Sequence, residues 1–217
     1  MSTAWEAMAL AKEARKQPTR LRFHRHETAK RWQDLYFIGM GDSSHATRPR
    51  GGSTGGVVIG CAGPEIADGM LTSISLLAWR SWKLKRKAIW TNGSEVQSLV
   101  ETEDILYKAR LLWGELHGAA VEEIDYEKRA DISVTCVPAI LATDSKGGYD
   151  AIVMNESADL GLANARSAVQ AYKLKECLEV NQAKLIWLAG DWSLADALTK
   201  KSLECRQSLT LFLRTWS

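Results

Sequence analysis

The chain has 217 residues, of which 46% are hydrophobic and 25% are charged. This composition is typical of a globular protein and excludes a wholly disordered or fibrous chain. The formal net charge is only +2, which is too small to indicate nucleic-acid binding by itself. The charge is unevenly spread, however. Residues 1–33 carry eight Lys or Arg against three acids, and residues 80–87 carry five bases and no acid.

Membrane and disulfide-dependent classes are also disfavoured. No uncharged stretch reaches the roughly 18–20 apolar residues that a membrane helix needs, so no membrane is expected as a partner. The N-terminus lacks the apolar core of a signal peptide, because charged residues interrupt it. The four cysteines are far apart and form no CxxC pair, which argues against a zinc or redox motif. We therefore expect a reduced, intracellular protein, in the cytoplasm or the nucleus.

The predicted elements begin with a basic, partly helical arm at residues 1–31, followed by one domain at residues 32–217. The first part of this domain is predicted to contain three strands and a long helix. The strands are expected at 34–41, 57–61 and 74–82, with a polar, glycine-rich turn at 43–56 between the first two. The long helix is expected at 92–117, because Asn92 or Ser94 can cap it and apolar residues recur at helical spacing.

The second half of the domain alternates strands with helices. A β-rich stretch at 131–143 leads to Asp144, and a loop with a short helix begins at residue 147. A helix at 163–180, a strand at 184–189 and a C-terminal helix at 192–215 complete the chain. Because the later strands alternate with helices, the order predicts an α/β fold in which helices pack against a mixed sheet.

Four acids stand at the ends of predicted strands or in the first turns of predicted helices. They are Asp42, Glu95, Asp144 and Asp196. Carboxylates gathered in one pocket repel each other unless cations neutralise them. Two magnesium ions held by such carboxylates can stabilise both the attacking and the leaving oxygen of a phosphodiester cleavage. The chain has 26 acids, so spacing alone leaves open that these four are ordinary solvent-exposed side chains.

Four segments, in a fixed order within residues 32–203, carry a family resemblance. They are IGMGDSSHATRPRGGSTGGVVIG, SWKLKRKAIWTNGSEVQSL, ILATDSKGGYDAI and WLAGDWSLADALTKKS. They resemble the ribonuclease H domain of copia-type LTR retrotransposon polyproteins, which belongs to the reverse transcriptase and ribonuclease H family. The first segment is similar to that domain's opening strand, polar loop and second strand. The last contains LADALTK, which is similar to the family's LADxLTK ending and is the most specific of the four motifs.

The resemblance implies a ribonuclease H-like fold, which is a five-stranded mixed sheet flanked by helices. It also implies endonucleolytic hydrolysis of the RNA strand of RNA–DNA hybrids with two Mg²⁺ ions, for which Mn²⁺ is an alternative. The family's catalytic and metal-binding acids correspond to Asp42, Glu95, Asp144 and Asp196. The implied partners are an RNA–DNA hybrid and a reverse transcriptase domain, since the chain resembles one piece of a retroelement polyprotein.

The basic run is the candidate nucleic-acid contact. Its members Lys83, Lys85, Arg86 and Lys87 have Trp79, Trp82 and Trp90 nearby. Lys and Arg bind the phosphate backbone in a salt-dependent manner, so these residues are expected to form a rim that holds the hybrid. The alternative is that the run is only the solvated end of a strand.

The chain departs from the family pattern near the expected site. Ser44 stands where the family has a second Asp, Gln97 replaces a second Glu, and Ser145 stands where Asn is common. Asp191 and Trp192 occupy the loop in which many cellular relatives have a His. Two alternatives therefore stay open. One is a catalytically degenerate module that binds nucleic acid or a polymerase partner, and the other is a nuclease of the same fold that acts on DNA.

Overall fold

The computed structural model describes residues 8, 12, 23–48, 51–85, 91–153, 165–200 and 202–215. Within these residues, five strands form one sheet: β1 (Tyr36–Arg48), β2 (Gly52–Ala62), β3 (Ser75–Lys83), β4 (Ala139–Thr143) and β5 (Ala183–Trp187). The α-helices are α2 (Thr91–Leu116), α3 (Tyr126–Thr135), α4 (Lys146–Val153), α5 (Ala165–Val180), α6 (Asp196–Thr199) and α7 (Leu203–Thr215). Short 3₁₀ helices are η1 (Trp32–Asp34), η3 (Pro64–Asp68) and η4 (Gly190–Trp192).

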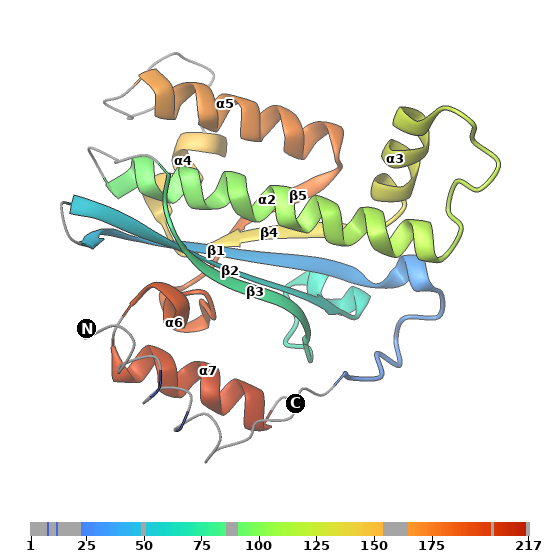
Figure 1. Ribbon diagram of the computed structural model, residues 1–217. Coiled ribbons are helices and arrows are strands. Elements are labelled where there is room, and N and C mark those ends of the chain that lie inside the picture. The colour runs from blue at the N-terminus through green and yellow to red at the C-terminus, as the bar shows by residue number, and fades with distance from the viewer. Residues whose placement is uncertain are drawn as a thin grey trace.

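The sheet is mixed, with the strand order β3-β2-β1-β4-β5. β2 pairs antiparallel with β1 and with β3, whereas β4 pairs parallel with β1 and with β5. Helices α2 and α5 lie on one side of the sheet, and α6 and α7 lie on the other (Figure 1). This architecture confirms the expected five-stranded mixed sheet with flanking helices.

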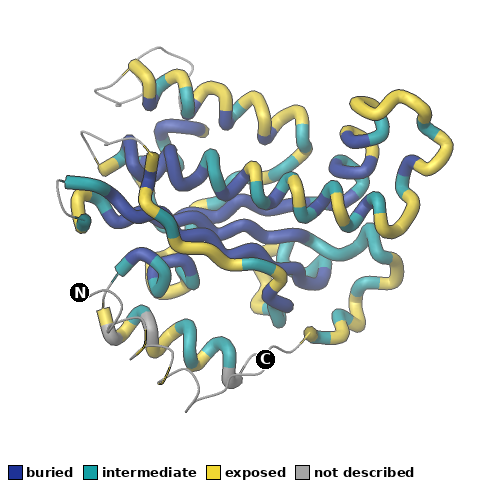
Figure 2. The backbone as a smooth tube through the Cα atoms, viewed as in Figure 1, coloured by how far each residue is buried: buried dark blue, intermediate teal, exposed yellow. Residues whose placement is uncertain are grey.

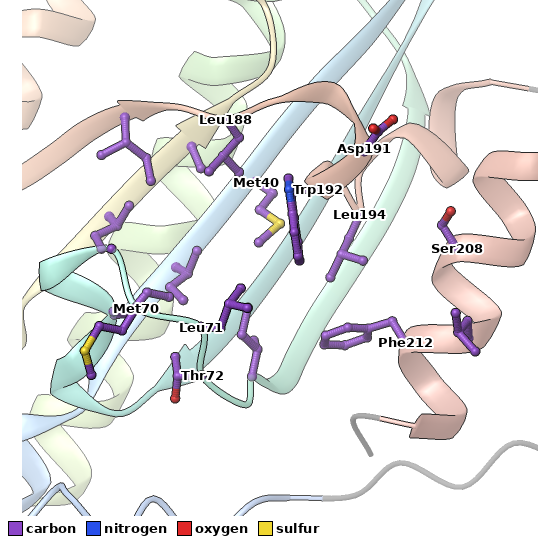
Figure 3. Close-up of a pocket in the computed structure, with 18 residues that line it drawn as sticks. Met40, Met70, Leu71, Thr72, Leu188, Asp191, Trp192, Leu194, Ser208 and Phe212 are labelled. Carbon is purple, nitrogen blue, oxygen red and sulfur yellow. The ribbon is translucent and has the colours of Figure 1, made fainter.

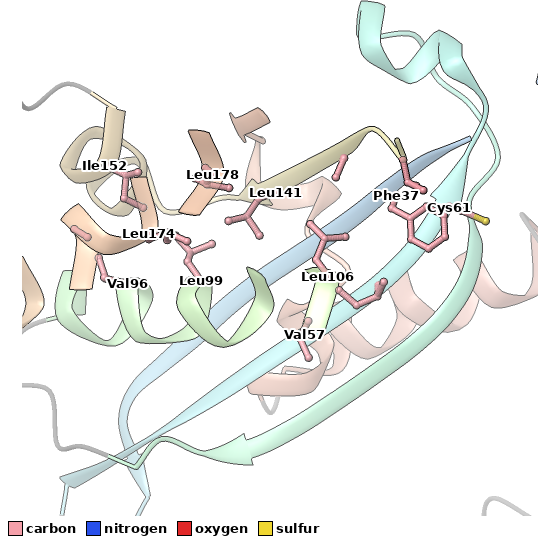
Figure 4. Close-up of a cluster of buried hydrophobic side chains, with 14 residues drawn as sticks. Phe37, Val57, Cys61, Val96, Leu99, Leu106, Leu141, Ile152, Leu174 and Leu178 are labelled. Atoms are coloured by element: carbon pink, nitrogen blue, oxygen red, sulfur yellow. The ribbon is translucent and has the colours of Figure 1, made fainter. Parts of the chain in front are cut away.

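Apolar side chains fill both faces of the sheet, because successive residues of a strand point to opposite sides. The strands are accordingly the most continuously buried part of the chain (Figure 2). On the α2 and α5 side, the cluster includes Phe37, Val57, Leu99, Leu141 and Leu174 (Figure 4). On the α6 and α7 side, it includes Ile38, Met40, Val58, Ala142 and Ala195. Full burial of one such large side chain contributes roughly 1.5–3 kcal/mol, so the two clusters hold the layers together.

The first hairpin is longer than predicted. Residues 43–56 were expected to form a turn, yet β1 continues to Arg48 and β2 begins at Gly52. The register pairs Asp42 with Gly56, so Asp42 lies inside a strand instead of at its end. A Cβ at Gly56 would lie only 2.7 Å from Thr199 Cγ2. This glycine therefore permits a close approach of α6 to the sheet, a role that glycine has in strands as well as in turns.

Residues 131–135 were predicted to be part of a β-rich stretch, and this prediction was wrong, because they end helix α3. The Asp125 side chain caps this helix by accepting hydrogen bonds from the backbone N–H groups of Glu127 and Lys128. Val134 is fully buried in the helical conformation. The β-branched residues of this segment favour a strand locally, but the cap and the burial outweigh that preference.

The predicted C-terminal helix at 192–215 is interrupted. The backbone of Lys200 is extended, with φ −100° and ψ 143°, and it ends α6. A new helix then starts at α7, where Ser202 Oγ accepts a hydrogen bond from the Glu204 N–H at 3.2 Å. The interruption allows the short α6 to lie over β2 and β1 while α7 packs separately, with Phe212 against the second apolar cluster.

The predicted helical part of the basic arm falls almost entirely outside the described residues. From residue 23 onward, the described chain is tied to the sheet edge, since the His24 N–H donates to Ser75 Oγ at 2.8 Å. Thr28 Oγ1 also donates a hydrogen bond to Glu65 in η3. The division into an arm at 1–31 and a domain at 32–217 stays a prediction. Among the described helices, none combines the length and the apolar character needed to cross a membrane.

Candidate functional site

Three aspartates from distant parts of the chain meet at the centre of the sheet. Asp42 lies in β1, Asp144 directly follows the adjacent parallel strand β4, and Asp196 begins α6. One carboxylate oxygen from each lies within 4.8 Å of those of the other two. Asp42 and Asp196 are buried, and Asp144 is partly buried. The structure therefore brings together three of the four acids that the sequence singled out.

Helix α6 can reach this position because the strand beneath it has a glycine, Gly56, at the point of contact. Gly56 is the β2 partner of Asp42, and a Cβ there would lie 3.0 Å from the backbone oxygen of Ala195. With no side chain in the way, Thr199 Oγ1 donates a short hydrogen bond to Asp42 Oδ2. The same close approach places Asp196 beside Asp42.

Glu95, the fourth predicted acid, flanks this group from the N-terminal part of α2. It is buried, and its Oε2 accepts a hydrogen bond from the Ser43 N–H at 3.1 Å. Two further hydrogen bonds tie α2 to β1: Ser43 Oγ donates to Ser94 Oγ at 2.9 Å, and Ser98 Oγ donates to the Asp42 backbone oxygen at 2.6 Å. Glu95 is thus held next to Asp42, although it is not one of the three mutually close carboxylates.

The ammonium group of Lys200 lies among the three aspartates. Lys200 Nζ donates a short hydrogen bond to Asp196 Oδ2. It also lies 3.8 Å from Asp144 Oδ2 and 4.0 Å from Asp42 Oδ1. One positive charge therefore faces several carboxylates.

Burial and mutual repulsion shift the protonation of these groups. Burial raises the pKa of Asp42 to about 7, even though the hydrogen bond from Thr199 favours its charged form. Burial and then the negative charge of Asp42 raise the pKa of Glu95 to about 8. Burial and the charge of Asp196 likewise raise the pKa of Asp144. A raised carboxyl pKa means that burial and neighbouring negative charges disfavour the charged form despite the nearby Lys200, and a bound divalent cation would favour that form.

The residues present fit a divalent cation that prefers oxygen ligands. Asp196 Oδ1 is buried and has no hydrogen-bond partner among the residues that the structure describes. A buried polar atom without a partner is costly, and a bound ion would satisfy it. The three close ligand groups are all carboxylates, a set that suits Mg²⁺ or Mn²⁺ better than the softer metals bound by Cys and His.

The candidate nucleic-acid residues are only partly described. Lys83 and Lys85 are exposed, whereas Arg86, Lys87 and the neighbouring Trp90 lie outside the described residues. Lys83 pairs with Thr54, which in turn pairs with Ser44. With strands about 4.8 Å apart, the Lys83 backbone lies about 10 Å from a residue two positions beyond Asp42.

Other side chains of the basic run have neighbours of their own. Lys85 Nζ lies 3.5 Å from a carboxylate oxygen of Glu101 on α2. Trp79 is exposed, and the Arg80 guanidinium lies 5.6 Å from the centre of the Trp82 ring. Part of the charge of Lys85 is therefore balanced by Glu101. Lys83, by its strand register, stands at the same end of the sheet as the aspartates.

Residues that depart from the family pattern have local partners. Ser44 Oγ donates to Thr47 Oγ1 at 2.8 Å, and the Gln97 side-chain amide donates to the Gly93 oxygen at 3.2 Å. Ser145 Oγ accepts a hydrogen bond from the backbone N–H of Gly148 at 3.1 Å, which caps the start of α4. Each of these three side chains thus has a hydrogen-bond partner close to it in the chain.

The loop before α6 borders a cavity. Between the sheet and α7 lies a mainly apolar cavity of about 660 Å³, with Met40, Leu188, Trp192 and Phe212 among its lining residues (Figure 3). Asp191 also lines this cavity and is not one of the three close aspartates. The cavity is therefore distinct from the carboxylate site.

Two site residues, Thr199 and Lys200, were not predicted from the sequence. Both belong to LADALTK, from which only Asp196 was selected because it matched a family acid. The motif was the available signal, since it keeps a hydroxyl and an ammonium group three and four residues after the acid. Residues at this spacing lie on one face of a helix.

No protein-family model and no curated protein matches the chain. Among solved structures, LC11-RNase H1, isolated from compost by a metagenomic approach, is 12% identical with a TM-score of 0.48, and the match covers 81% of this chain and 99% of that chain. The foamy viral protease-reverse transcriptase in complex with an RNA/DNA hybrid is 12% identical with a TM-score of 0.43, and the match covers 89% of this chain but 22% of that one. A dsDNA complex of the foamy viral protein is 10% identical with a TM-score of 0.37, covering 76% of this chain and 91% of that chain. These identities are too low to assign an activity.

Proposed function

We propose that this chain is a ribonuclease H, which uses divalent metal ions to hydrolyse the RNA strand of RNA–DNA hybrids. The observation that carries the proposal is the convergence of Asp42, Asp144 and Asp196 at the centre of a five-stranded mixed sheet. The four sequence segments that resemble copia-type ribonuclease H domains support it, because each of them supplies one of the proposed acids.

In this proposal, Asp42, Asp144 and Asp196, with Glu95 beside them, would hold the ions. The ions would activate the attacking water and stabilise the leaving 3′ oxygen. The chain's own contribution is to keep the carboxylates in place. Ser43 and Thr199 restrain two of them by hydrogen bonds, and the Trp187 indole N–H donates to the Asp144 backbone oxygen at 3.0 Å. Groups that are already oriented need little rearrangement during the reaction.

The substrate is proposed to lie across the end of the sheet that carries the basic run. The phosphate backbone would contact the basic side chains of this run, which are Lys83, Lys85, Arg86 and Lys87. Contacts to the 2′-hydroxyl groups in the wide minor groove would distinguish the RNA strand from DNA. We also propose that a reverse transcriptase domain is the natural partner, since that domain makes the hybrid.

The test is a cleavage assay with a hybrid whose RNA strand is labelled, in the presence of Mg²⁺ or Mn²⁺. The intact chain is expected to cleave the RNA, and Asp42→Asn and Asp144→Asn are each expected to lower the rate more than about a hundredfold, since even outer partners of metal ligands matter 10–100-fold. Asp104→Asn is a matched control, because Asp104 is an exposed aspartate paired only with Lys108 among the described contacts. Wild-type rates in both site variants would show that the site is wrongly assigned.

A catalytically degenerate module that only binds nucleic acid is the second candidate. It is favoured by one observation, namely that an ammonium group already contacts all three aspartates. This candidate predicts hybrid binding without cleavage in either metal. Cleavage of duplex DNA in preference to the hybrid would instead indicate a DNA nuclease.

A further inference from the structure

The ammonium group of Lys200 lies between the carboxylates of the three aspartates. Its Nζ lies within ion-pair distance of carboxylates from β1, from the β4–α4 junction and from α6. The side chains of Asp42, Asp144 and Asp196 are only 3%, 14% and 12% exposed, whereas that of Lys200 is 39% exposed. The ammonium group therefore enters a mostly buried set of carboxylates from the solvent side.

The ammonium group and a divalent ion both draw on the carboxylates of Asp42, Asp144 and Asp196. Mg²⁺ binds carboxylate oxygens at about 2.0–2.1 Å, and each hydrogen bond from the ammonium group uses part of the acceptor capacity of these carboxylates. A lysine held between the ligands would also repel an entering cation at short range. Contact of Lys200 with the three aspartates and coordination of an ion by the same carboxylates therefore oppose each other.

The attachment of Lys200 allows its side chain to leave without unfolding α6. The helix is closed by the Lys200 backbone N–H, which donates to the Asp196 backbone oxygen at 2.8 Å, and not by the side chain. The long aliphatic stem can rotate about several bonds, and its partial exposure gives the ammonium group a path to water.

We propose that Lys200 is a tethered counter-ion of the metal-free site and that it competes with divalent metal ions for the aspartates. This inference rests on the proposed function in one respect, because it takes Asp42, Asp144 and Asp196 as metal ligands. It does not require that the bound metal supports cleavage. Occupation by Lys200 stabilises the gathered carboxylates before metal arrives, and displacement of Lys200 weakens the apparent metal affinity.

The test compares Mn²⁺ binding by the full chain and by Lys200→Met, measured by calorimetry in the absence of nucleic acid. Methionine keeps an unbranched stem and removes the charge. Removal of the competing cation is expected to lower the Kd for Mn²⁺ about tenfold, which corresponds to about 1.4 kcal/mol. The metal-free variant is expected to melt at a lower temperature, since its carboxylates have lost their counter-ion.

Lys108→Met is the matched control. Lys108 pairs with Asp104 at the same spacing of four residues, but on an exposed face of α2. This variant is expected to bind Mn²⁺ as the wild-type chain does. An unchanged or weaker Mn²⁺ affinity in Lys200→Met would overturn the inference, and so would the absence of Mn²⁺ binding in both the wild type and this variant.

A second measurement uses the wild-type chain, so that the inference does not depend on how the variant folds. The NMR signal of the Lys200 side-chain methylene next to Nζ, assigned with Lys200→Arg, is expected to move on saturation with Mg²⁺, while that of Lys108 stays in place. A stationary Lys200 signal despite metal binding would contradict displacement. Competition in a chain that cleaves no hybrid would support this inference while refuting the proposed function. Hybrid cleavage with an unchanged metal affinity in Lys200→Met would refute only the inference.

Discussion

At the scale of single residues, the carboxyl group of Asp42 is in surroundings that disfavour its charged form. The Asp42 side chain is 3% exposed, and the residue lies inside a strand. Only two side chains among the described residues oppose its charge, Thr199 through a hydrogen bond and Lys200 through its ammonium group. A carboxylate in such surroundings is destabilising unless cations are added or the group is protonated.

The first prediction concerns pH. In the metal-free folded protein, burial raises the pKa of Asp42 to about 7 and that of Glu95 to about 8, whereas their ordinary values are 3.8 and 4.5. Between pH 5 and pH 8, the folded state therefore holds protons that the unfolded chain has released, so stability falls as the pH rises. Urea unfolding in the presence of a chelator is expected to give a lower free energy of unfolding at pH 8.5 than at pH 5.5.

The control for this prediction is Asp42→Asn, which removes one of the carboxyl groups whose pKa is raised. The variant is expected to lose less stability over the same pH interval. A free energy of unfolding that is equal at the two pH values, or higher at pH 8.5, would contradict the raised pKa values.

Single residues were predictable from the sequence where a motif marked them. Asp42, Asp144 and Asp196 were selected by resemblance, and their proximity in space is observed, while their catalytic role stays a prediction. Lys200 was not selected. A lysine close to acids is common on protein surfaces, and only the three-dimensional positions reveal that this lysine faces carboxylates from three separate elements.

At the scale of elements, the short helix α6 connects the site to the sheet. It lies where it does because Gly56 on β2 presents no side chain, so that Ala195 and Thr199 come into contact with the strand. The position of Asp196 relative to Asp42 therefore depends on a residue that has no chemistry of its own.

The second prediction is that Gly56→Ala displaces α6. The added Cβ would lie 2.7 Å from Thr199 Cγ2 and 3.0 Å from the Ala195 backbone oxygen, and the backbone atom cannot rotate away. Overpacking of this kind destabilises by about 1–3 kcal/mol. Mn²⁺ affinity, measured by calorimetry, is expected to fall about tenfold, as when a metal ligand loses its support.

Gly39→Ala is the companion variant, because Gly39 lies in β1 under α2 instead of α6. A Cβ there would lie 3.0 Å from the Thr102 side chain. This variant is expected to lose stability and keep its Mn²⁺ affinity. If both variants kept wild-type affinity, the position of α6 would not control the site.

The elements that sequence patterns misassigned have a common physical cause. The glycines of 51–56 suggested a turn because glycine is frequent in turns. Here Gly55 and Gly56 lie in a strand instead, where Trp82 and Leu84 approach Gly55 closely and α6 approaches Gly56. The residues of α3 suggested a strand by their β-branched side chains, and a capping aspartate decides otherwise. The long helix α2 was predicted within about one residue at each end, because its apolar spacing and its tertiary contacts agree.

At the scale of the whole molecule, charge is distributed so that acids and bases meet at one end of the sheet. At this end, the aspartates gather around the middle strand β1. Lys83 lies two strands away, on the edge strand β3. A nucleic-acid backbone that contacts the lysines would lie near the aspartates, which on their own would repel it. This arrangement was predictable only in outline, because the sequence places residues 80–87 next to the helix that carries Glu95 but does not give the strand order.

The third prediction concerns this surface. Lys83→Ala is expected to weaken binding of an RNA–DNA hybrid by a few fold and to reduce the slope of log Kd against log salt by about 1, as expected for the loss of one phosphate contact. Fluorescence anisotropy at several salt concentrations, with Ca²⁺ in place of Mg²⁺ to limit cleavage, measures both quantities.

Lys184→Ala is the matched variant, since Lys184 is an exposed lysine on β5, the opposite edge strand. Its salt slope is expected to equal that of the wild-type chain. Equal slopes for all three proteins would remove Lys83 from the binding surface.

The separation of the aspartates along the chain has a consequence for biosynthesis. Asp42 lies in β1 and Asp144 directly follows β4, and these two strands can pair before the C-terminal segment is made, whereas Asp196 emerges from the ribosome only after all five strands of the sheet. A nascent polypeptide thus lacks a complete ligand set until translation has passed α6. Under the proposed function, the growing chain cannot hold its metal ions with all of the proposed acids before residue 196 has been made.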